Sequence, residues 1–346
     1  MKKYITLLAA AALLVFLYAA KKTNSNPYGL QKGNPAIKSI GSLSFGPDGV
    51  LIIGDSKSAA LFAVDTKDRT APEKAAPVEI QRIDEKIAAA LGTEIKNIKI
   101  QDIAINPISK KLYCSVQNID GSSVLLSYQD GKFSAVNLSD VEFSKADISN
   151  APAEDQKDRQ GRSLRDGVIS DLQYSNGSVL VSGISNQEFG STFRKMAFPF
   201  TGKQDHASLE IYHAAHGKYE TSSPIRTFTT ATLNGKEYLV ASYTCTPLVI
   251  FPMDELQPGK HVKGRTVGEF GAGNSPIDMI TISKGGNNYL VMANTNRPVM
   301  RVKYKSIEDF AGSVTEPIKE SYSTAGVDFV TLPVVNVVQM DKLDDT

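Results

Sequence analysis

Tryptophan is absent from this chain of 346 residues, cysteine occurs only twice, and neither sign of charge dominates. The lack of tryptophan excludes WD-type repeats and other families whose repeat unit or pocket depends on that residue. Two cysteines are too few for a disulfide scaffold or for a zinc site of four cysteines. Because 38 basic residues balance 37 acidic ones, we do not expect a surface for nucleic acid.

The chain opens with a short apolar run that has a pair of lysines on each side. The run covers residues 5–20, which suits a secretory signal peptide and is shorter than the roughly 20 residues that span a bilayer comfortably. We therefore expect residues 1–22 to be a signal peptide, or else an uncleaved anchor in the inner membrane and the only membrane contact of the chain. In both cases the remainder is expected outside the cytoplasm, in the periplasm or secreted.

From residue 41 onward the sequence repeats one pattern: a short alternating strand, a turn rich in Gly, Asn or Asp, and a second strand. Period-two alternation and this turn chemistry predict β-hairpins. The five clearest hairpins cover residues 43–55, 102–116, 171–184, 226–243 and 278–294, and a sixth is expected over residues 328–340. One position of the second strand is always small, which indicates close packing of neighbouring sheets. It is occupied by Gly54, Ser115, Gly183, Ser242 and Ala293.

Repeats of about 50 to 70 residues, with room for four strands each, predict an all-β protein with the β-propeller fold. Six blades fit the repeats best, and seven are the alternative. Because the last repeat has room for only two strands, residues 27–40 are expected to complete the C-terminal blade and close the ring. Residues 27–346 are expected to form one domain. Within it, residues 83–91 predict a short amphipathic helix that stops at Gly92, and residues 150–167 an exposed loop.

Two columns of polar residues are expected at one mouth of the central channel, because the loops on either side of a hairpin share a face of the propeller. The first column opens the innermost strands and consists of Ser42, Asp102, Asp171, Arg226, Asp278 and Asp328. The second follows the second strands and consists of Lys57, Asn118, Asn186, Cys245 and Asn296. The ligand-binding residues predicted from this alignment are Asp102, Asn118, Asp171, Asn186, Arg226, Tyr243, Asp278, Asn296 and Asp328.

Four aspartates around a channel have two interpretations. Carboxylate and amide oxygens suit a hard cation such as calcium. An aspartate that opens a strand can instead accept backbone N–H groups from its own or a neighbouring blade, which would be a structural role. Arg226 in the same column argues mildly against a cation, or else pairs with one aspartate. We favour the structural role.

The segment from His213 to Thr221 is the most distinctive of the chain, because it holds two of the four histidines. His213 and His216 precede the fourth blade and should lie on the same face as Cys245. Two imidazoles and a thiol suit a borderline or soft metal ion such as zinc or copper. The same residues could act as a cysteine nucleophile with a histidine base, or simply hydrogen-bond the loop. The blade assignment places Cys114 in a strand too far from Cys245 for a disulfide.

The repeats resemble those of exported six-bladed propellers of the TolB-like and NHL-like kind. The segments over residues 211–221 and 241–249 are similar to parts of uncharacterised exported propeller proteins of bacteria. Calcium-dependent lactonases of similar architecture hold a central ion with Glu and Asn or Asp, and Asp102, Asp171, Asn118 and Asn186 resemble that set. The chain departs from the lactonase pattern because no glutamate stands in the columns.

These observations favour a binding or scaffold protein over an enzyme. A polar funnel would present its side chains to a protein, a glycan or a small molecule. The alternative is a metal-dependent hydrolase or lyase, lactonase-like, in which a divalent cation at the channel mouth polarises the substrate or activates water.

Overall fold

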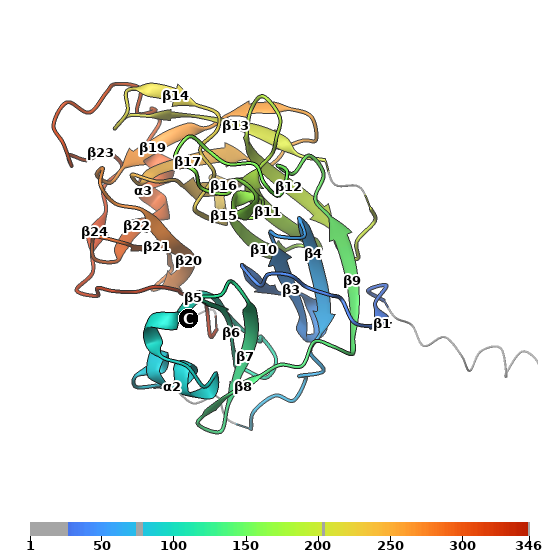
Figure 1. Ribbon diagram of the computed structural model, residues 1–346. Coiled ribbons are helices and arrows are strands. Elements are labelled where there is room, and N and C mark those ends of the chain that lie inside the picture. Colours follow the sequence, from blue (N-terminus) through green and yellow to red (C-terminus); the bar gives the residue numbers. More distant parts are fainter. Residues whose placement is uncertain (1–26, 74–78, 203–204, 345–346) are drawn as a thin grey trace, which may run out of the picture.

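Five sheets radiate around one centre in the computed structural model, which describes residues 27–73, 79–202 and 205–344 (Figure 1). The all-β prediction and the β-propeller prediction are confirmed, and the described residues form five blades. The predicted signal peptide or anchor at residues 1–22 lies outside the described residues. Among the described residues, no helix is long and apolar enough to cross a membrane.

Each blade is built mainly from antiparallel strands, which are numbered along the chain. Blade 1 contains β1 (Gln31–Gly33), β2 (Leu43–Phe45), β3 (Val50–Asp55), β4 (Ala60–Asp65) and β9 (Val141–Asp147). Blade 2 contains β5 (Ile98–Ile105), β6 (Leu112–Asn118), β7 (Ser123–Gln129) and β8 (Lys132–Ala135). Blade 3 contains β10 (Asp171–Ser175), β11 (Ser178–Ile184), β12 (Ser191–Ala197), β13 (Ala207–His213), β14 (Lys218–Glu220) and β18 (His261–Lys263).

The last two blades come from the C-terminal part of the chain. Blade 4 contains β15 (Thr227–Leu233), β16 (Lys236–Ser242), β17 (Pro247–Pro252), β19 (Arg265–Glu269) and β23 (Ala325–Gly326). Blade 5 contains β20 (Pro276–Lys284), β21 (Asn287–Asn294), β22 (Met300–Lys303) and β24 (Val330–Thr331). Two α-helices are described, α2 (Ile83–Ala90) and α3 (Tyr304–Asp309).

The five inner hairpins are the part of the sequence prediction that the fold confirms most directly. Strands β2 and β3, β5 and β6, β10 and β11, β15 and β16, and β20 and β21 pair antiparallel. Hairpins depend on alternation and turn residues within about 15 positions, so local sequence suffices to specify them. The predicted helix also forms, since α2 begins at Ile83 and Gly92 follows it with a φ of 65°.

The predicted sixth blade is wrong. Residues 328–340 contain only one strand, β24, which adds to the outer edge of blade 5, and β23 just before them adds to that of blade 4. The chain beyond β24 then runs back to the centre. There Asp278 Oδ2 accepts the backbone N–H of Met340 at 2.6 Å, and Asp341 Oδ2 accepts that of Ile105 at 2.6 Å. This C-terminal segment therefore joins blade 5 to blade 2, where a further blade was expected.

The predicted closure by N-terminal strands is also wrong. Strand β1 pairs with β9 at the outer edge of blade 1 and does not reach a C-terminal blade. Residues 36–40 form no strand, because the buried carboxylate of Asp55 accepts the backbone N–H groups of Lys38 and Ser39. Blade 2 lies in the sequence between β4 and β9, so blade 1 is completed only by a strand that follows blade 2 along the chain.

Apolar side chains fill the spaces between adjacent blades. One core cluster joins blades 1 and 3, and another joins blades 3 and 4. The small column lies at these contacts. A Cβ atom built on Gly54 would lie 2.9 Å from Ile169 Cγ2, and one built on Gly183 would lie 1.9 Å from the carbonyl oxygen of Val168. The close packing predicted for this column is therefore present at Gly54 and Gly183.

Candidate metal site and channel

His213, His216 and Cys245 converge at the junction of blades 3 and 4. His213 is the last residue of β13, His216 lies in the turn before β14, and Cys245 lies in the turn between β16 and β17. One donor atom from each side chain lies within 4.8 Å of the other two. Among the described residues, this is the only group of three or more His, Cys, Asp or Glu side chains with donor atoms that close.

A single carboxylate orients both imidazoles. Glu220 Oε2 lies 3.1 Å from His213 Nδ1, and Glu220 Oε1 lies 2.7 Å from His216 Nδ1. Burial alone would raise the pKa of Glu220, but hydrogen bonds from His213, His216 and Ser223 outweigh it and hold the pKa at about 2. The ionised carboxylate can only accept, so each Nδ1 carries a proton. In the neutral form of each ring, the Nε2 lone pair is then left for another partner.

A second glutamate lies on the buried side of the cluster. Glu269 is fully buried at the end of β19, and its Oε1 accepts the backbone N–H of Ala214 at 3.0 Å. Oε1 also lies 3.8 Å from His213 Nε2, which is beyond a hydrogen bond. Glu269 Oε2 and His213 Nε2 have no hydrogen-bond partner among the described residues. Burial raises the pKa of Glu269 to about 7.

His213 Nε2 and Glu269 Oε2 are thus buried polar atoms without a hydrogen-bond partner among the described residues. Burying an unpaired polar group costs about 1–3 kcal/mol, so native structures rarely retain two together. A metal ion on His213 Nε2 would satisfy the imidazole, whereas Glu269, whose raised pKa favours the protonated carboxyl, lies outside the three-residue group. The nearby thiol of Cys245 gives the donor set its soft character, which fits zinc or copper and not calcium.

The turn that carries Cys245 has an unusual backbone. Cys245 and Thr246 have φ values of 68° and 61°, a conformation that non-glycine residues rarely adopt. The turn is held in this form by the Thr246 hydroxyl, which donates to the Gly271 carbonyl at 3.1 Å, and by the Cys245 N–H, which donates to the Asn274 carbonyl at 2.8 Å. The strained turn is therefore held by the loop between β19 and β20, which connects blade 4 to blade 5.

The channel aspartates have a different arrangement. Asp102 Oδ2 accepts the N–H of Leu43 at 2.7 Å, and Asp171 Oδ2 accepts that of Phe228 at 3.0 Å. Asp278 makes the equivalent bond to the C-terminal segment. Each carboxylate thus fixes the innermost strand of the next unit around the ring, which is the structural role that we favoured for the column.

These carboxylates are surrounded by protein and by one another. Burial raises the pKa of Asp171 to about 7, and burial together with the charge of Asp171 raises that of Asp278 to about 8. Burial and the charge of Asp278 also raise the pKa of Asp102. As whole residues, the three aspartates are only partly buried. Their oxygens are not close enough to form a three-ligand group.

The three predicted asparagines form hydrogen bonds with other loop residues. Asn118 Nδ2 donates to Ser122 Oγ at 2.9 Å, Asn296 Nδ2 donates to the Gly273 carbonyl at 2.8 Å, and Asn186 Oδ1 accepts from Gln187 Nε2 at 3.1 Å. Asn118 and Asn186 therefore bond within their own loops, whereas Asn296 connects its loop to the loop between β19 and β20.

Three predicted positions need correction. Thr227, and not Arg226, stands opposite the small residue Ser242, because the register of β15 is shifted by one residue from the predicted one. Tyr243 is buried in the core between blades 3 and 4 and cannot face a ligand in the channel. Asp328 is exposed between β23 and β24, outside the channel, since there is no sixth blade for it to open.

The predicted separation of the two cysteines is confirmed. Both are free, and Cys114 is fully buried in β6 of blade 2. Burial raises the pKa of the Cys114 thiol to about 12, which makes it an inert part of the core.

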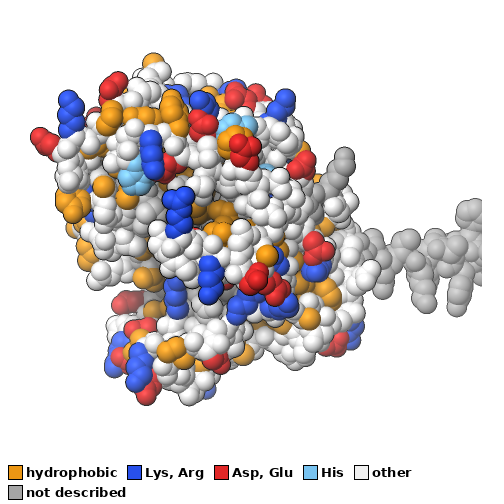
Figure 2. Space-filling view, turned by 45° about the horizontal axis from the view of Figure 1, so that its top comes forward, with side chains coloured by type: hydrophobic (Ala, Val, Ile, Leu, Met, Phe, Trp, Pro, Cys, Tyr) orange, Lys and Arg blue, Asp and Glu red, His pale blue; other side chains and the backbone are white. Residues whose placement is uncertain are grey.

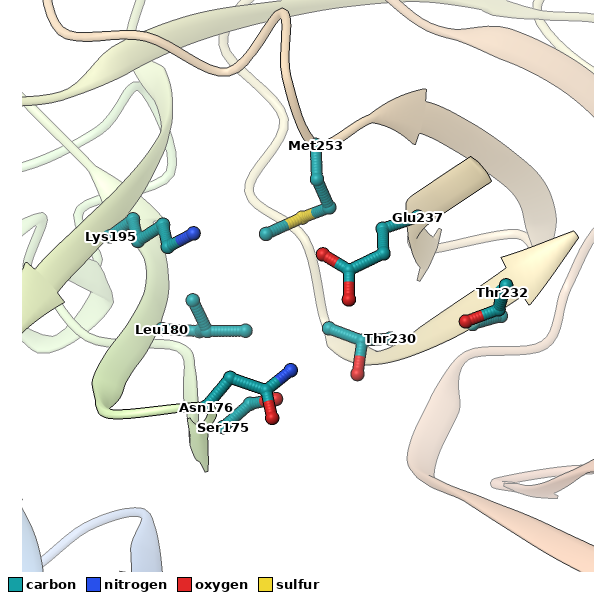
Figure 3. Close-up of a pocket in the computed structure, with 9 residues that line it drawn as sticks. Ser175, Asn176, Leu180, Lys195, Thr230, Thr232, Glu237 and Met253 are labelled. Carbon is teal, nitrogen blue, oxygen red and sulfur yellow. The ribbon is translucent and has the colours of Figure 1, made fainter. Parts of the chain in front are cut away.

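The structure also contains a cavity that the sequence did not indicate. It lies between blades 3 and 4, near the turns of their inner hairpins. Its volume is about 160 Å³, and it opens between the β10–β11 turn of blade 3 and strands β15 and β16 of blade 4. Lys195 and Glu237 extend toward it from opposite walls, with Met253 above and Thr230 below (Figure 3). The lining residues come from separate strands, so no local pattern in the sequence could have grouped them.

Comparison with known proteins assigns no family. No protein-family model matches the chain, and no curated protein matches it. Solved structures that resemble it include a PQQ-bound aldose sugar dehydrogenase from Streptomyces coelicolor, with 11% identity, a TM-score of 0.29, and coverage of 88% of this chain and 86% of that one.

A streptogramin B lyase matches with 9% identity, a TM-score of 0.30, and coverage of 79% of this chain and 86% of that one. A chain of a mitotic checkpoint complex matches with 9% identity, a TM-score of 0.35, and coverage of 92% and 88%. No function is transferred from structures this distant. The arrangement of the five sheets defines the protein as a β-propeller.

Proposed function

We propose that this chain is an extracytoplasmic binding propeller that holds one zinc or copper ion between blades 3 and 4. His213, His216 and Cys245 are its ligands. The observation that carries the proposal is the position of Glu220, which occupies Nδ1 of both imidazoles and leaves both Nε2 atoms for a metal. A carboxylate behind a metal-bound histidine is a common second shell, because it sets the tautomer and raises the basicity of the ring.

The central channel is a weaker candidate for a metal-binding site than the junction of blades 3 and 4. Its aspartates are engaged with backbone N–H groups of neighbouring strands, and their raised pKa values disfavour the ionised form that a calcium site requires. The mixed surface charge of the face in Figure 2, where acidic and basic side chains are interspersed, suits a small ligand or a protein partner better than nucleic acid.

The location outside the cytoplasm is part of the same proposal. It rests on the composition of residues 1–22 and on the resemblance of the repeats to exported TolB-like and NHL-like propellers. The absence of a disulfide does not conflict with it, because the two cysteines lie in different blades.

A metal-dependent hydrolase or lyase is the second candidate, and one observation favours it. His216 is exposed and Cys245 is only partly buried, whereas His213 lies inside. Three protein ligands with an open side are typical of catalytic zinc, in which water or substrate takes the fourth position.

The binding proposal is tested with purified protein by elemental analysis and by titration with Zn²⁺, Cu²⁺ and Ca²⁺. We expect about one zinc or copper ion per chain, and a chelator should lower the melting temperature. At a free metal concentration of 100 times Kd, the ion would stabilise the fold by about 2.7 kcal/mol. The variants His213→Ala, His216→Ala and Cys245→Ser should lose the ion.

His206→Ala is the matched control, since His206 directly precedes β13 of the same blade but lies outside the cluster. Metal binding that persists in all three cluster variants, or that is lost equally in the control, would refute the site. Binding of Ca²⁺ alone would transfer the proposal to the channel. Metal-dependent turnover of a lactone or ester would favour the second candidate.

A further inference from the structure

A serine, a histidine and a glutamate form a hydrogen-bonded chain on blade 3, on the face of the sheet opposite to the side chain of His213. Strands β13 and β18 pair in parallel, with Ser208 opposite His261. Ser208 Oγ lies 2.9 Å from His261 Nδ1, and His261 Nε2 lies 2.9 Å from Glu210 Oε2. Because Ser208 and Glu210 are two residues apart on one strand, both side chains are on the same face of the sheet and the imidazole lies between them.

The glutamate determines which nitrogen of His261 carries the proton. Burial would raise the pKa of Glu210, but hydrogen bonds from His261 and Lys263 outweigh it and lower the pKa. Lys263 Nζ contacts the other carboxylate oxygen at 2.9 Å. An ionised carboxylate accepts the proton on Nε2, which leaves Nδ1 as the acceptor for the serine hydroxyl. The order of the three groups is nucleophile, base, carboxylate, which is the arrangement that activates a serine.

The imidazole is also held by packing. The rings of Phe189 and His261 have centroids 4.1 Å apart and an interplanar angle of 31°. A ring held by a carboxylate on one nitrogen and by an aromatic neighbour on its face has little freedom to turn away from Ser208. A base in a fixed orientation transfers a proton more effectively than a mobile one.

The serine faces a cavity large enough for a small molecule. Ser208 is among the residues that line a space of about 320 Å³ at the edge of blade 3. Phe189 is the aromatic residue of this lining, which also contains Asn150 and Lys260 together with the acidic Glu188 and Asp205. The side-chain amide of Asn150 and the ammonium group of Lys260 are the groups of this lining that could stabilise negative charge on an oxygen of a bound molecule.

We propose that Ser208 is the nucleophile of an esterase site, with His261 as its general base and Glu210 as the residue that positions His261. The substrate class is small carboxylic esters, whose acyl group enters the cavity beside Phe189. This site lies beyond the proposed metal-binding function and shares no ligand with it, since Ser208 and Glu210 face away from His213 on the alternating strand β13.

The reaction balances with water as the only co-reactant. Ser208 Oγ forms a bond to the ester carbonyl carbon while His261 Nδ1 takes the hydroxyl proton. The tetrahedral intermediate collapses, the bond to the alkoxy oxygen breaks, and His261 gives its proton to the departing alcohol. Water, deprotonated by His261, then attacks the acyl carbon, and the carboxylic acid leaves as Ser208 regains its proton.

Hydrolysis of p-nitrophenyl acetate and labelling with a fluorophosphonate probe test the proposal on the full chain. We expect probe attachment at Ser208 by mass spectrometry and a loss of both signals in Ser208→Ala. His261→Ala should lower kcat by about 10²-fold or more. Glu210→Gln should lower kcat with little change in KM, and Glu210→Asp should restore part of it, which a merely structural role would not produce.

The exposed serine of β8 offers a matched control, because Ser134→Ala removes a hydroxyl far from the site. It should keep wild-type rates and labelling. Circular dichroism of each variant separates loss of activity from loss of fold. Hydrolysis by Ser208→Ala at the wild-type rate, or probe attachment at another serine, would overturn the proposal. A rate that falls with a chelator but not in Ser208→Ala would assign the activity to the metal site instead.

Discussion

The substitution Gly183→Ala should destabilise the fold strongly, because no space exists for a methyl group at this position. A Cβ on Gly183 would lie 1.9 Å from the carbonyl oxygen and 2.6 Å from the carbonyl carbon of Val168, and 3.0 Å from the carbonyl oxygen of Gly167. All three atoms belong to backbone, so no side chain can rotate away. The chain between blades 1 and 3 would have to move to make room.

The magnitude follows from the kind of clash. Overpacking by side-chain contacts costs typically about 1–3 kcal/mol, and a backbone displacement costs more. We therefore expect a loss of at least about 3 kcal/mol, which is a large share of the roughly 5–15 kcal/mol of a typical domain. Because the chain has no tryptophan, urea unfolding is followed best by far-UV circular dichroism.

Gly33→Ala is the matched control. Gly33 is also a strand glycine, but its added Cβ would meet only Phe143 Cε1, at an ordinary contact distance of 3.7 Å. Its unfolding free energy should stay within about 0.5 kcal/mol of wild type. If Gly183→Ala matched this control, the close packing of the small column would not be a determinant of the fold, and the reasoning would fail.

Three further predictions concern acidic side chains. Asp171 and Asp278 have pKa values of about 7 and about 8 in the folded chain, against an ordinary value of 3.8, so the folded state binds more protons between these values and stability falls as the pH rises through that range. Thermal melts should show a loss of at least about 2 kcal/mol from about pH 5 to about pH 9. Glu220→Gln should weaken metal binding about 10–100-fold without removing a ligand, as measured by titration calorimetry. Asp341→Ala should free the C-terminal segment from Ile105, which hydrogen exchange of residues 338–344 would detect.

Each of these has an outcome that contradicts it. A melting temperature that is constant or rises across that pH range would mean that the channel carboxylates are ionised in the fold. Unchanged metal affinity in Glu220→Gln would separate that carboxylate from the site, and Glu142→Gln serves as the control because Glu142 lies away from the cluster. Exchange in Asp341→Ala that equals wild type would show that other contacts hold the segment.

The candidate metal site was partly visible in the sequence. The two histidines stood close together, and the repeat register placed Cys245 on their face, so three residues from two blades could be grouped without a structure. Glu220 lay in the same segment but had no recognisable role, since its function depends on both imidazoles turning toward it. Glu269 could not be found at all, because its position beside Ala214 depends on the pairing of β19.

Sequence patterns predicted least well which strands pair when the pairing strands lie far apart in the chain. Ser208 and His261 lie 53 residues apart, and only the parallel pairing of β13 with β18 brings them together with Glu210. Likewise, Asp328 looked like the start of another blade, because an aspartate before an alternating segment opens other hairpins of the chain, as Asp102 and Asp171 do. Instead of pairing with each other in a new blade, the short strands on either side of Asp328 pair with existing ones: β23 with β19 of blade 4, and β24 with β22 of blade 5.

By itself, the sequence determined the inner hairpins, the small column between blades and the composition of the two polar columns. These features depend on alternation, turn residues and side-chain size within short stretches of chain. Only the tertiary structure decided the number of blades, the partner of each outer strand and the closure of the ring by the C-terminal segment. Outer strands lie at sheet edges with open hydrogen-bonding groups, so their choice of partner depends on which edge the folded chain brings near.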